Sequence, residues 1–181
     1  LDRKFGLRTI PLALLALCIV SFGLLIPELG IYWDDWEIIT MLRLYKLSEF
    51  WNYFSGSRPL AAWTYIVFGP FMGANVIAWH IFSLFTRWLA VVAMWWAFCN
   101  LWPQNQRQVT LAAFLFAVYP IFVQQPIALS YHQHWIAYFL YFISIGTMIE
   151  AIHKPRYFWS LTLVSLICLI LNLATFEYFV G

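Results

Sequence analysis

The chain has 181 residues, of which 64% are hydrophobic, 21% are aromatic and only 10% are charged. Soluble domains usually carry about 25% charged residues, so these charges are too few to coat a water-soluble globule, and a soluble enzyme domain is excluded. Each of the three cysteines lies in an apolar run, where a thiol behaves as a small hydrophobe, so a disulfide-rich scaffold is excluded too. The composition therefore predicts an all-α integral membrane protein.

The first predicted element is a membrane-spanning helix over residues 10–27. It has the roughly 20 apolar residues that a span needs, and basic residues precede it. A signal peptide has a similar pattern, but this run is long and no small-residue cleavage site precedes Glu28, so we expect an uncleaved helix. Because the sequence starts with Leu1 and stops just after an apolar run, we also expect it to be the N-terminal part of a longer chain.

Residues 28–75 are predicted to form a large loop with helices that lie at the membrane surface. Eight charged side chains lie between Glu28 and Arg58, in an amphipathic pattern interleaved with Trp and Tyr. Residues 59–73 are apolar but short, and Gly and Pro interrupt them. That stretch is either a short span or a surface or re-entrant helix.

The charges favour the arrangement in which residues 59–73 do not cross. Basic residues of the N-terminal tail then lie on the same side as Arg107, Lys154 and Arg156, as the positive-inside rule expects. This arrangement places the N-terminus in the cytoplasm and residues 28–75 outside. The predicted fold is a polytopic transmembrane bundle with interfacial helices in its first outer loop, and its further spans cover residues 76–100, 108–123, 133–152 and 157–176.

The adjacent carboxylates of Asp34 and Asp35 are the first candidate for chemistry. Flanked by tryptophans at a bilayer surface, an Asp can act as a general base or bind a divalent cation such as Mg or Mn. A neighbouring like charge and partial burial would each raise a carboxyl pKa. Alternatively, Asp34 or Asp35 caps a helix that begins near Trp36, and the two roles are compatible.

Three basic side chains are candidates for binding a phosphate. Arg58 precedes Pro59, which suits the first position of a helix, and its guanidinium either binds a phosphate or snorkels at the membrane boundary. His80 and Arg87 share one face of the second span. Arg87 lies near the middle of that span, where an ionisable residue indicates either a functional site or an internal salt bridge.

Polar residues also gather near the start of the fourth span. Tyr131, His132 and His134 suit sugar recognition, or they belong to an ordinary polar loop, because a two-residue His spacing alone is weak evidence for a metal site. Glu177 follows the last span as either an interface residue or a carboxylate facing a cavity. The sequence contains no Gly-rich phosphate loop and no nucleic-acid-binding pattern.

The order of these features resembles the GT-C class of membrane glycosyltransferases over residues 8–178. An Asp-Asp pair follows the first span, an Arg-Pro-Leu helix comes next and a Trp-His pair opens the second span. A Phe-Ala-x-Tyr-Pro motif then ends the third span, and a Glu follows the last one. The chain looks closest to the branch similar to protein O-mannosyltransferases and bacterial polyprenyl-phosphate-sugar transferases.

The resemblance implies transfer of a sugar from a polyprenyl-phosphate donor to a glycan, lipid or protein hydroxyl, on the non-cytoplasmic face of a bacterial plasma membrane. It implies a catalytic role for the Asp pair, with Asp34 favoured as the base. It also places Arg58 near the donor phosphate, with His80 and Arg87 as further donor-binding candidates. The remaining candidates, on the substrate side, are Tyr131, His132, His134 and Glu177.

Two other functions stay open from the sequence. The chain is alternatively a non-catalytic subunit that packs within a larger membrane complex. It is otherwise a transporter for a lipid-linked anion, with Arg87 in the transport path.

Overall fold

The computed structural model describes residues 3–56, 58–119 and 125–176, and every regular element in these ranges is helical. This confirms the all-α prediction. The α-helices are α1 (Arg3–Cys18), α2 (Asp35–Leu44), α3 (Glu49–Phe54), α4 (Trp63–Met72), α5 (Val76–Leu101), α6 (Gln106–Ala117), α7 (Ala128–His153) and α8 (Phe158–Thr175).

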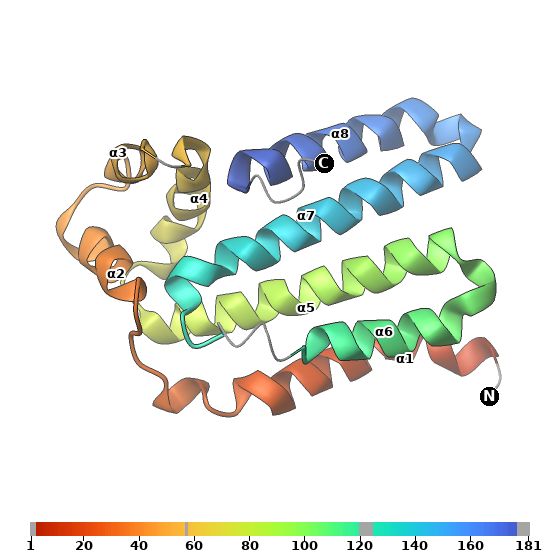
Figure 1. Ribbon diagram of the computed structural model, residues 1–181, viewed down its shortest axis with the longest axis horizontal. Coiled ribbons are helices and arrows are strands. Elements are labelled where there is room, and N and C mark those ends of the chain that lie inside the picture. Colours follow the sequence, from red (N-terminus) through yellow and green to blue (C-terminus); the bar gives the residue numbers. More distant parts are fainter. Residues whose placement is uncertain (1–2, 57, 120–124, 177–181) are drawn as a thin grey trace.

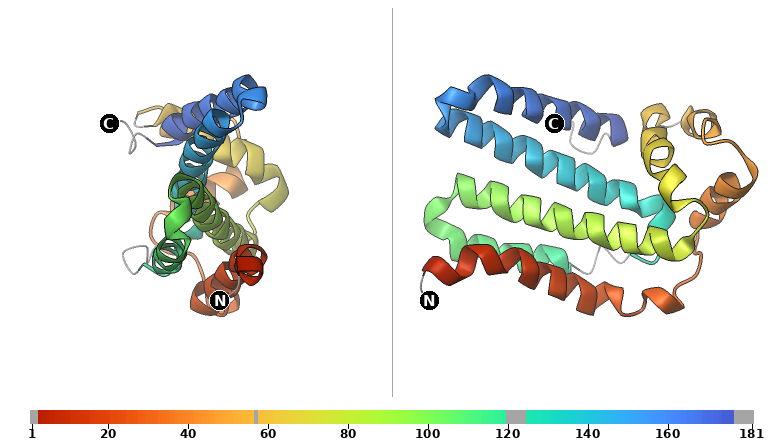
Figure 2. Two further views of the ribbon diagram at one scale, coloured as in Figure 1. Left: turned by 90° about the vertical axis from the view of Figure 1, so that its right-hand side faces the viewer. Right: turned by 180° about the vertical axis from the view of Figure 1, so that it is seen from behind.

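Five of these helices form a bundle, and the three short helices α2, α3 and α4 gather at one end of it (Figure 1). In the bundle, α5 packs along α7, α7 packs along α8, and α1 packs against α5 and α6. The view from behind shows the same order of helices (Figure 2). The start of α1 and the turns between α5 and α6 and between α7 and α8 lie at the opposite end of the bundle.

Four segments are long and apolar enough to cross a membrane: Thr9–Glu28, Val76–Leu101, Ala128–His153 and Pro155–Thr175. The span predicted over residues 108–123 is not among them, because its helix α6 ends at Ala117 and is too short. Twelve residues of α-helix cover about 18 Å, which is less than the roughly 30 Å of a bilayer core. The chain leaves the helix just before Pro120, since a proline disfavours helical backbone in the residue that precedes it.

The apolar stretch 59–73 does not run along the bundle. It forms a short 3-10 helix, Pro59–Ala62, followed by α4, and both lie at the same end as α2 and α3 (Figure 1). The chain then enters α5 from that same end. At the other end, Lys154 and Arg156 belong to the turn between α7 and α8, and Arg107 lies in the first turn of α6.

Two apolar cores hold this arrangement together. One lies inside the bundle between α1, α5, α6 and α7, where Gly146 of α7 faces the indole of Trp96 on α5. A Cβ atom at residue 146 would lie within 3.0 Å of three atoms of that ring, so the close packing of α5 and α7 requires glycine there. The second core fixes the short helices to the starts of α5 and α7, and it consists of Ile38, Ile39, Phe50, Ala62, Tyr65, Trp79 and Leu129.

Candidate functional site

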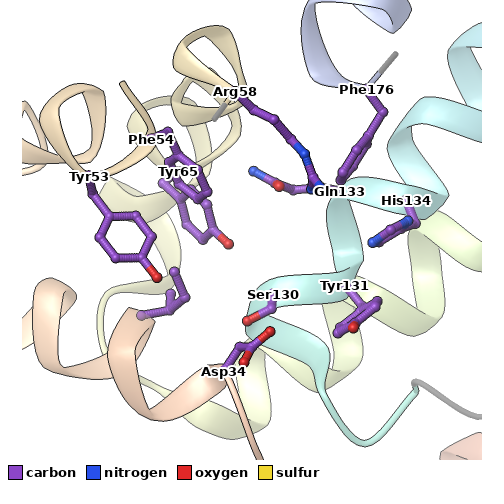
Figure 3. Close-up of a pocket in the computed structure, with 11 residues that line it drawn as sticks. Asp34, Tyr53, Phe54, Arg58, Tyr65, Ser130, Tyr131, Gln133, His134 and Phe176 are labelled. Carbon is purple, nitrogen blue, oxygen red and sulfur yellow. The ribbon is translucent and has the colours of Figure 1, made fainter. Parts of the chain in front are cut away.

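A cavity of about 280 Å³ lies where the short helices meet the start of α7 (Figure 3). Among the described residues, its wall has one carboxylate, one guanidinium and several aromatic rings. The lining residues are Asp34, Ile38, Tyr53, Phe54, Arg58, Tyr65, Ser130, Tyr131, Gln133, His134 and Phe176.

The two carboxylates of the Asp pair have separate surroundings. Asp34 is exposed and lines the cavity, whereas Asp35 is fully buried. Asp35 accepts hydrogen bonds from the backbone N–H of Leu129 to Oδ2 (3.2 Å) and of Ser130 to Oδ1 (2.8 Å). The expectation that this pair caps its own helix is therefore wrong: Asp34 makes no side-chain capping bond to α2 among the described residues, and Asp35 caps α7 instead.

The backbone before the pair explains how neighbouring side chains diverge. Trp33 adopts a φ of 47°, which bulky side chains rarely do, and a tight turn follows in which the N–H of Asp35 donates to the carbonyl of Tyr32. Such strain persists only where the surrounding structure holds it in place. After this turn, the side chain of Asp35 contacts the start of α7, whereas the side chain of Asp34 lines the cavity.

The environment of Asp35 also bears on metal binding. Burial raises the pKa of the Asp35 carboxyl above its usual range, and the hydrogen bonds from α7 and the nearby His80 oppose that rise. Because both carboxylate oxygens accept N–H groups, a divalent cation held jointly by Asp34 and Asp35 does not fit this arrangement. Within the described ranges, no cluster of three or more His, Cys, Asp or Glu side chains could hold a metal ion.

Arg58 stands at the end of a column of stacked planar groups. Its guanidinium carbon lies 4.8 Å from the centre of the Phe176 ring. That ring stacks on His134 at 4.4 Å, and His134 stacks on Tyr131 at 4.8 Å. Figure 3 shows Arg58 and Phe176 side by side on the cavity wall opposite Asp34. The column holds the guanidinium of Arg58 against the Phe176 ring.

Pro59 opens a short helix after Arg58, as the sequence predicted, although it is a 3-10 helix of four residues. Tyr131 and His134 line the cavity, and they belong to α7 and not to a loop; that they bind substrate stays a prediction. The helix begins at Ala128, five residues before the predicted start of the span.

His132 does not join its neighbours at the cavity. Residues two positions apart on a helix point to nearly opposite sides, so His132 faces the core while His134 faces the cavity. The His132 ring is buried against Tyr65 and Trp79, and its Nδ1 donates to the carbonyl of Leu129 (2.9 Å). The prediction that His132 contacts substrate is therefore not supported by its position.

His80 and Arg87 are both buried on α5, and neither lines the cavity. His80 donates from Nε2 to the carbonyl of Gly30 (3.1 Å), which ties α5 to the chain that follows α1. The guanidinium carbon of Arg87 lies 3.6 Å from the Phe22 ring centre and 4.4 Å from that of Trp135, and Nη1 donates to Gln125 Oε1 (3.4 Å). Unlike Arg58, these two residues do not line the cavity, so their positions do not support a role in donor binding. Their contacts join neighbouring segments of the fold instead. Glu177 lies outside the described residues.

Several lining residues were not predicted from the sequence, and their hydrogen bonds join the segments that surround the cavity. Tyr53 donates its hydroxyl proton to Glu37. Tyr65 donates to the carbonyl of Leu129 (2.8 Å), and the amide of Gln133 donates to the carbonyl of Ala61 (2.8 Å). The aromatic content of residues 50–65 was the only sequence signal for this wall, because each partner is remote in the chain.

Fold and site together define a helical protein whose apolar helices are long enough to cross a membrane. At one end of its bundle lies an aromatic cavity that is lined by both a carboxylate and a guanidinium. No family model, no curated protein and no solved structure matches the chain. Its function is therefore argued from the cavity.

Proposed function

We propose that this protein is a membrane glycosyltransferase of the GT-C type. It transfers a sugar from a polyprenyl-phosphate donor to an acceptor hydroxyl on the non-cytoplasmic face of a bacterial plasma membrane. The acceptor is a glycan, lipid or protein of the cell envelope.

One observation carries the proposal: Asp34 and Arg58 come from separate segments and line the same aromatic cavity. A guanidinium suits a phosphate, and a carboxylate in the same cavity suits the removal of a hydroxyl proton. Aromatic rings such as Tyr53 and Tyr131 give a sugar ring flat apolar surfaces. This combination matches a sugar joined to a phosphate.

The positions of the charges support the proposed orientation. Arg107, Lys154 and Arg156 lie at the bundle end opposite the cavity (Figure 1). The positive-inside rule places a basic end in the cytoplasm, so the cavity opens on the other face. The helices α2, α3 and α4 would then lie at the non-cytoplasmic surface of the plasma membrane, where the exposed side chains of Trp33 and Trp36 suit the interface.

The proposed reaction is a single displacement at the anomeric carbon. The acceptor oxygen forms a bond to that carbon as its bond to the phosphate oxygen breaks, and the electron pair leaves with the phosphate. Asp34 takes the acceptor proton, and Arg58 stabilises the charge that develops on the departing phosphate. The anomeric configuration is therefore inverted.

The test uses the full-length protein in nanodiscs with radiolabelled polyprenyl-phosphate hexoses and pentoses and a membrane extract as acceptor source. We expect Asp34→Asn to abolish transfer, while Glu28→Gln, which removes an exposed carboxylate outside the cavity lining, keeps it. Transfer by Asp34→Asn at the wild-type rate would refute the proposed mechanism. Absence of transfer by the wild type with every donor would favour a non-catalytic subunit.

A further inference from the structure

Asp35 joins the two walls of the cavity. It lies on α2, directly after Asp34, and both of its oxygens accept N–H groups of α7, 94 and 95 residues further along the chain. Ser130, which donates one of these bonds, itself lines the cavity beside Tyr131. The carboxylate is thus one residue from the proposed base and bonded to the opposite wall.

The start of α7 depends on this remote carboxylate. The first N–H groups of any helix have no partners within the helix and need an acceptor. Ile127, which precedes α7, has no side-chain acceptor and makes no capping bond. A carboxylate at this position satisfies two of these N–H groups and interacts favourably with the positive end of the helix dipole.

We propose that Asp35 is a positioning residue that fixes Asp34 relative to the α7 wall of the cavity. This inference rests on the proposed function, and it assigns the two carboxylates different tasks: Asp34 touches the reacting groups, and Asp35 acts through α2 and α7. Because Asp35 occupies the start of α7, that helix terminus does not bind the donor phosphate, which falls to Arg58.

The geometry predicts which kinetic constant changes when the bond is lost. Arg58 is fixed separately, by its contact with the Phe176 ring, which in turn stacks on His134. Loss of the Asp35 bonds therefore shifts the base and leaves donor binding in place. A displacement of the base by about 1 Å can cost about 100-fold in rate, so we expect kcat to fall about 10- to 100-fold with the donor KM unchanged.

The test compares Asp35→Asn with Asn75→Ala in the full-length protein. Asn75 caps α5 through a bond from the N–H of Ala78 (3.1 Å) and does not line the cavity, so its variant also loses a helix cap. We expect a lowered kcat per folded molecule only for Asp35→Asn. Asp35→Glu keeps the charge but lengthens the side chain by about 1.5 Å, so it should fold and still lower kcat at constant donor KM. Equal losses of kcat in Asp35→Asn and Asn75→Ala would overturn the proposal.

A second measurement does not depend on catalysis. Spin labels replace the exposed side chains Trp36 on α2 and Ile152 on α7, with the three native cysteines changed to alanine. We expect the distance distribution between the labels to shift or broaden in Asp35→Asn and to stay unchanged in Asn75→Ala. An unchanged distribution in Asp35→Asn overturns the positioning role, whether or not the protein transfers sugar. A changed distribution in a protein without transfer activity supports the link between α2 and α7 and refutes only the proposed function.

Discussion

Replacing Arg58 should weaken binding of the lipid-phosphate donor by an amount that the cavity lets us work out. A hydrogen bond to a charged group contributes about 1.5–3 kcal/mol, and each 1.4 kcal/mol is a factor of ten in binding. If Arg58 makes one such bond to the phosphate, Arg58→Ala should raise the donor KM about 10- to 150-fold. The effect should weaken at high salt, because Arg58 is exposed to solvent.

The stack on Phe176 adds a second, smaller effect that can be separated. A cation–π contact at an exposed site is worth about 0.5–1 kcal/mol, so Phe176→Leu should raise the donor KM about two- to fivefold. Arg58→Lys keeps the charge but loses the flat face that stacks, and its effect should fall between the two. Adding Phe176→Leu to Arg58→Ala should change the donor KM little, because the ring then has no guanidinium to position.

The assay is initial-rate sugar transfer in nanodiscs at varied donor concentration, with Lys46→Ala as a control for loss of a positive charge outside the cavity lining. A donor KM for Arg58→Ala within twofold of the wild type would refute the assignment of Arg58 to the phosphate. Equal effects of Phe176→Leu in the presence and absence of Arg58 would show that the stack does not position the guanidinium.

Three further predictions concern stability, measured as thermal unfolding in detergent. Gly146→Ala should destabilise the protein by about 1–3 kcal/mol, because the new Cβ meets the Trp96 ring. Gly56→Ala is the control, because the space around Gly56 is open and its variant should unfold at the wild-type midpoint. Equal unfolding midpoints for the two variants would contradict the close packing at Gly146. Because the folded-state pKa of Asp35 is raised, the stability that its protonation contributes is fully present below the usual Asp pKa of about 4 and is lost as pH rises through the raised value. The midpoint of the wild type relative to Asp35→Asn should therefore fall as pH rises above about 4. A difference that grows with pH would contradict that sign. Arg87→Lys should lower the midpoint while leaving the donor KM unchanged, because lysine cannot stack between the two rings that flank Arg87; a raised donor KM would return Arg87 to the binding site.

The long apolar helices were predictable because their signal is local. Runs such as Val76–Leu101 exceed the length that a bilayer requires, and composition alone reveals them. The start of α7 was not predicted, because a local signal is misleading there. Its first turns are rich in Ser, Tyr, His and Gln and look like a loop by composition. The fold makes them helical because their polar groups have partners, such as Gln133 with Ala61, in a segment about seventy residues away.

The Asp pair marks the limit of sequence reasoning about the site. The charge pattern marked the pair as a candidate, and Asp34 lines the cavity, although its role as a base stays a prediction. The role of Asp35 was not visible, because its partners are 94 and 95 residues away and are main-chain groups, which leave no signature in the residue types. The same holds for the stack between Arg58 and Phe176, which only the fold brings together.

The main chain of Leu129 explains how these remote contacts act together on the cavity. Its N–H donates to Asp35, and its carbonyl accepts from the hydroxyl of Tyr65 (2.8 Å) and from His132 (2.9 Å). Burial and the nearby carboxylate of Asp35 raise the pKa of Tyr65 well above its usual value, so Tyr65 stays protonated and remains a donor at any physiological pH. One residue of α7 is therefore bonded to α2 and to α4 at once. Hydrogen bonds shielded from water are costly to break, so this residue holds both walls of the cavity in one geometry before any substrate arrives.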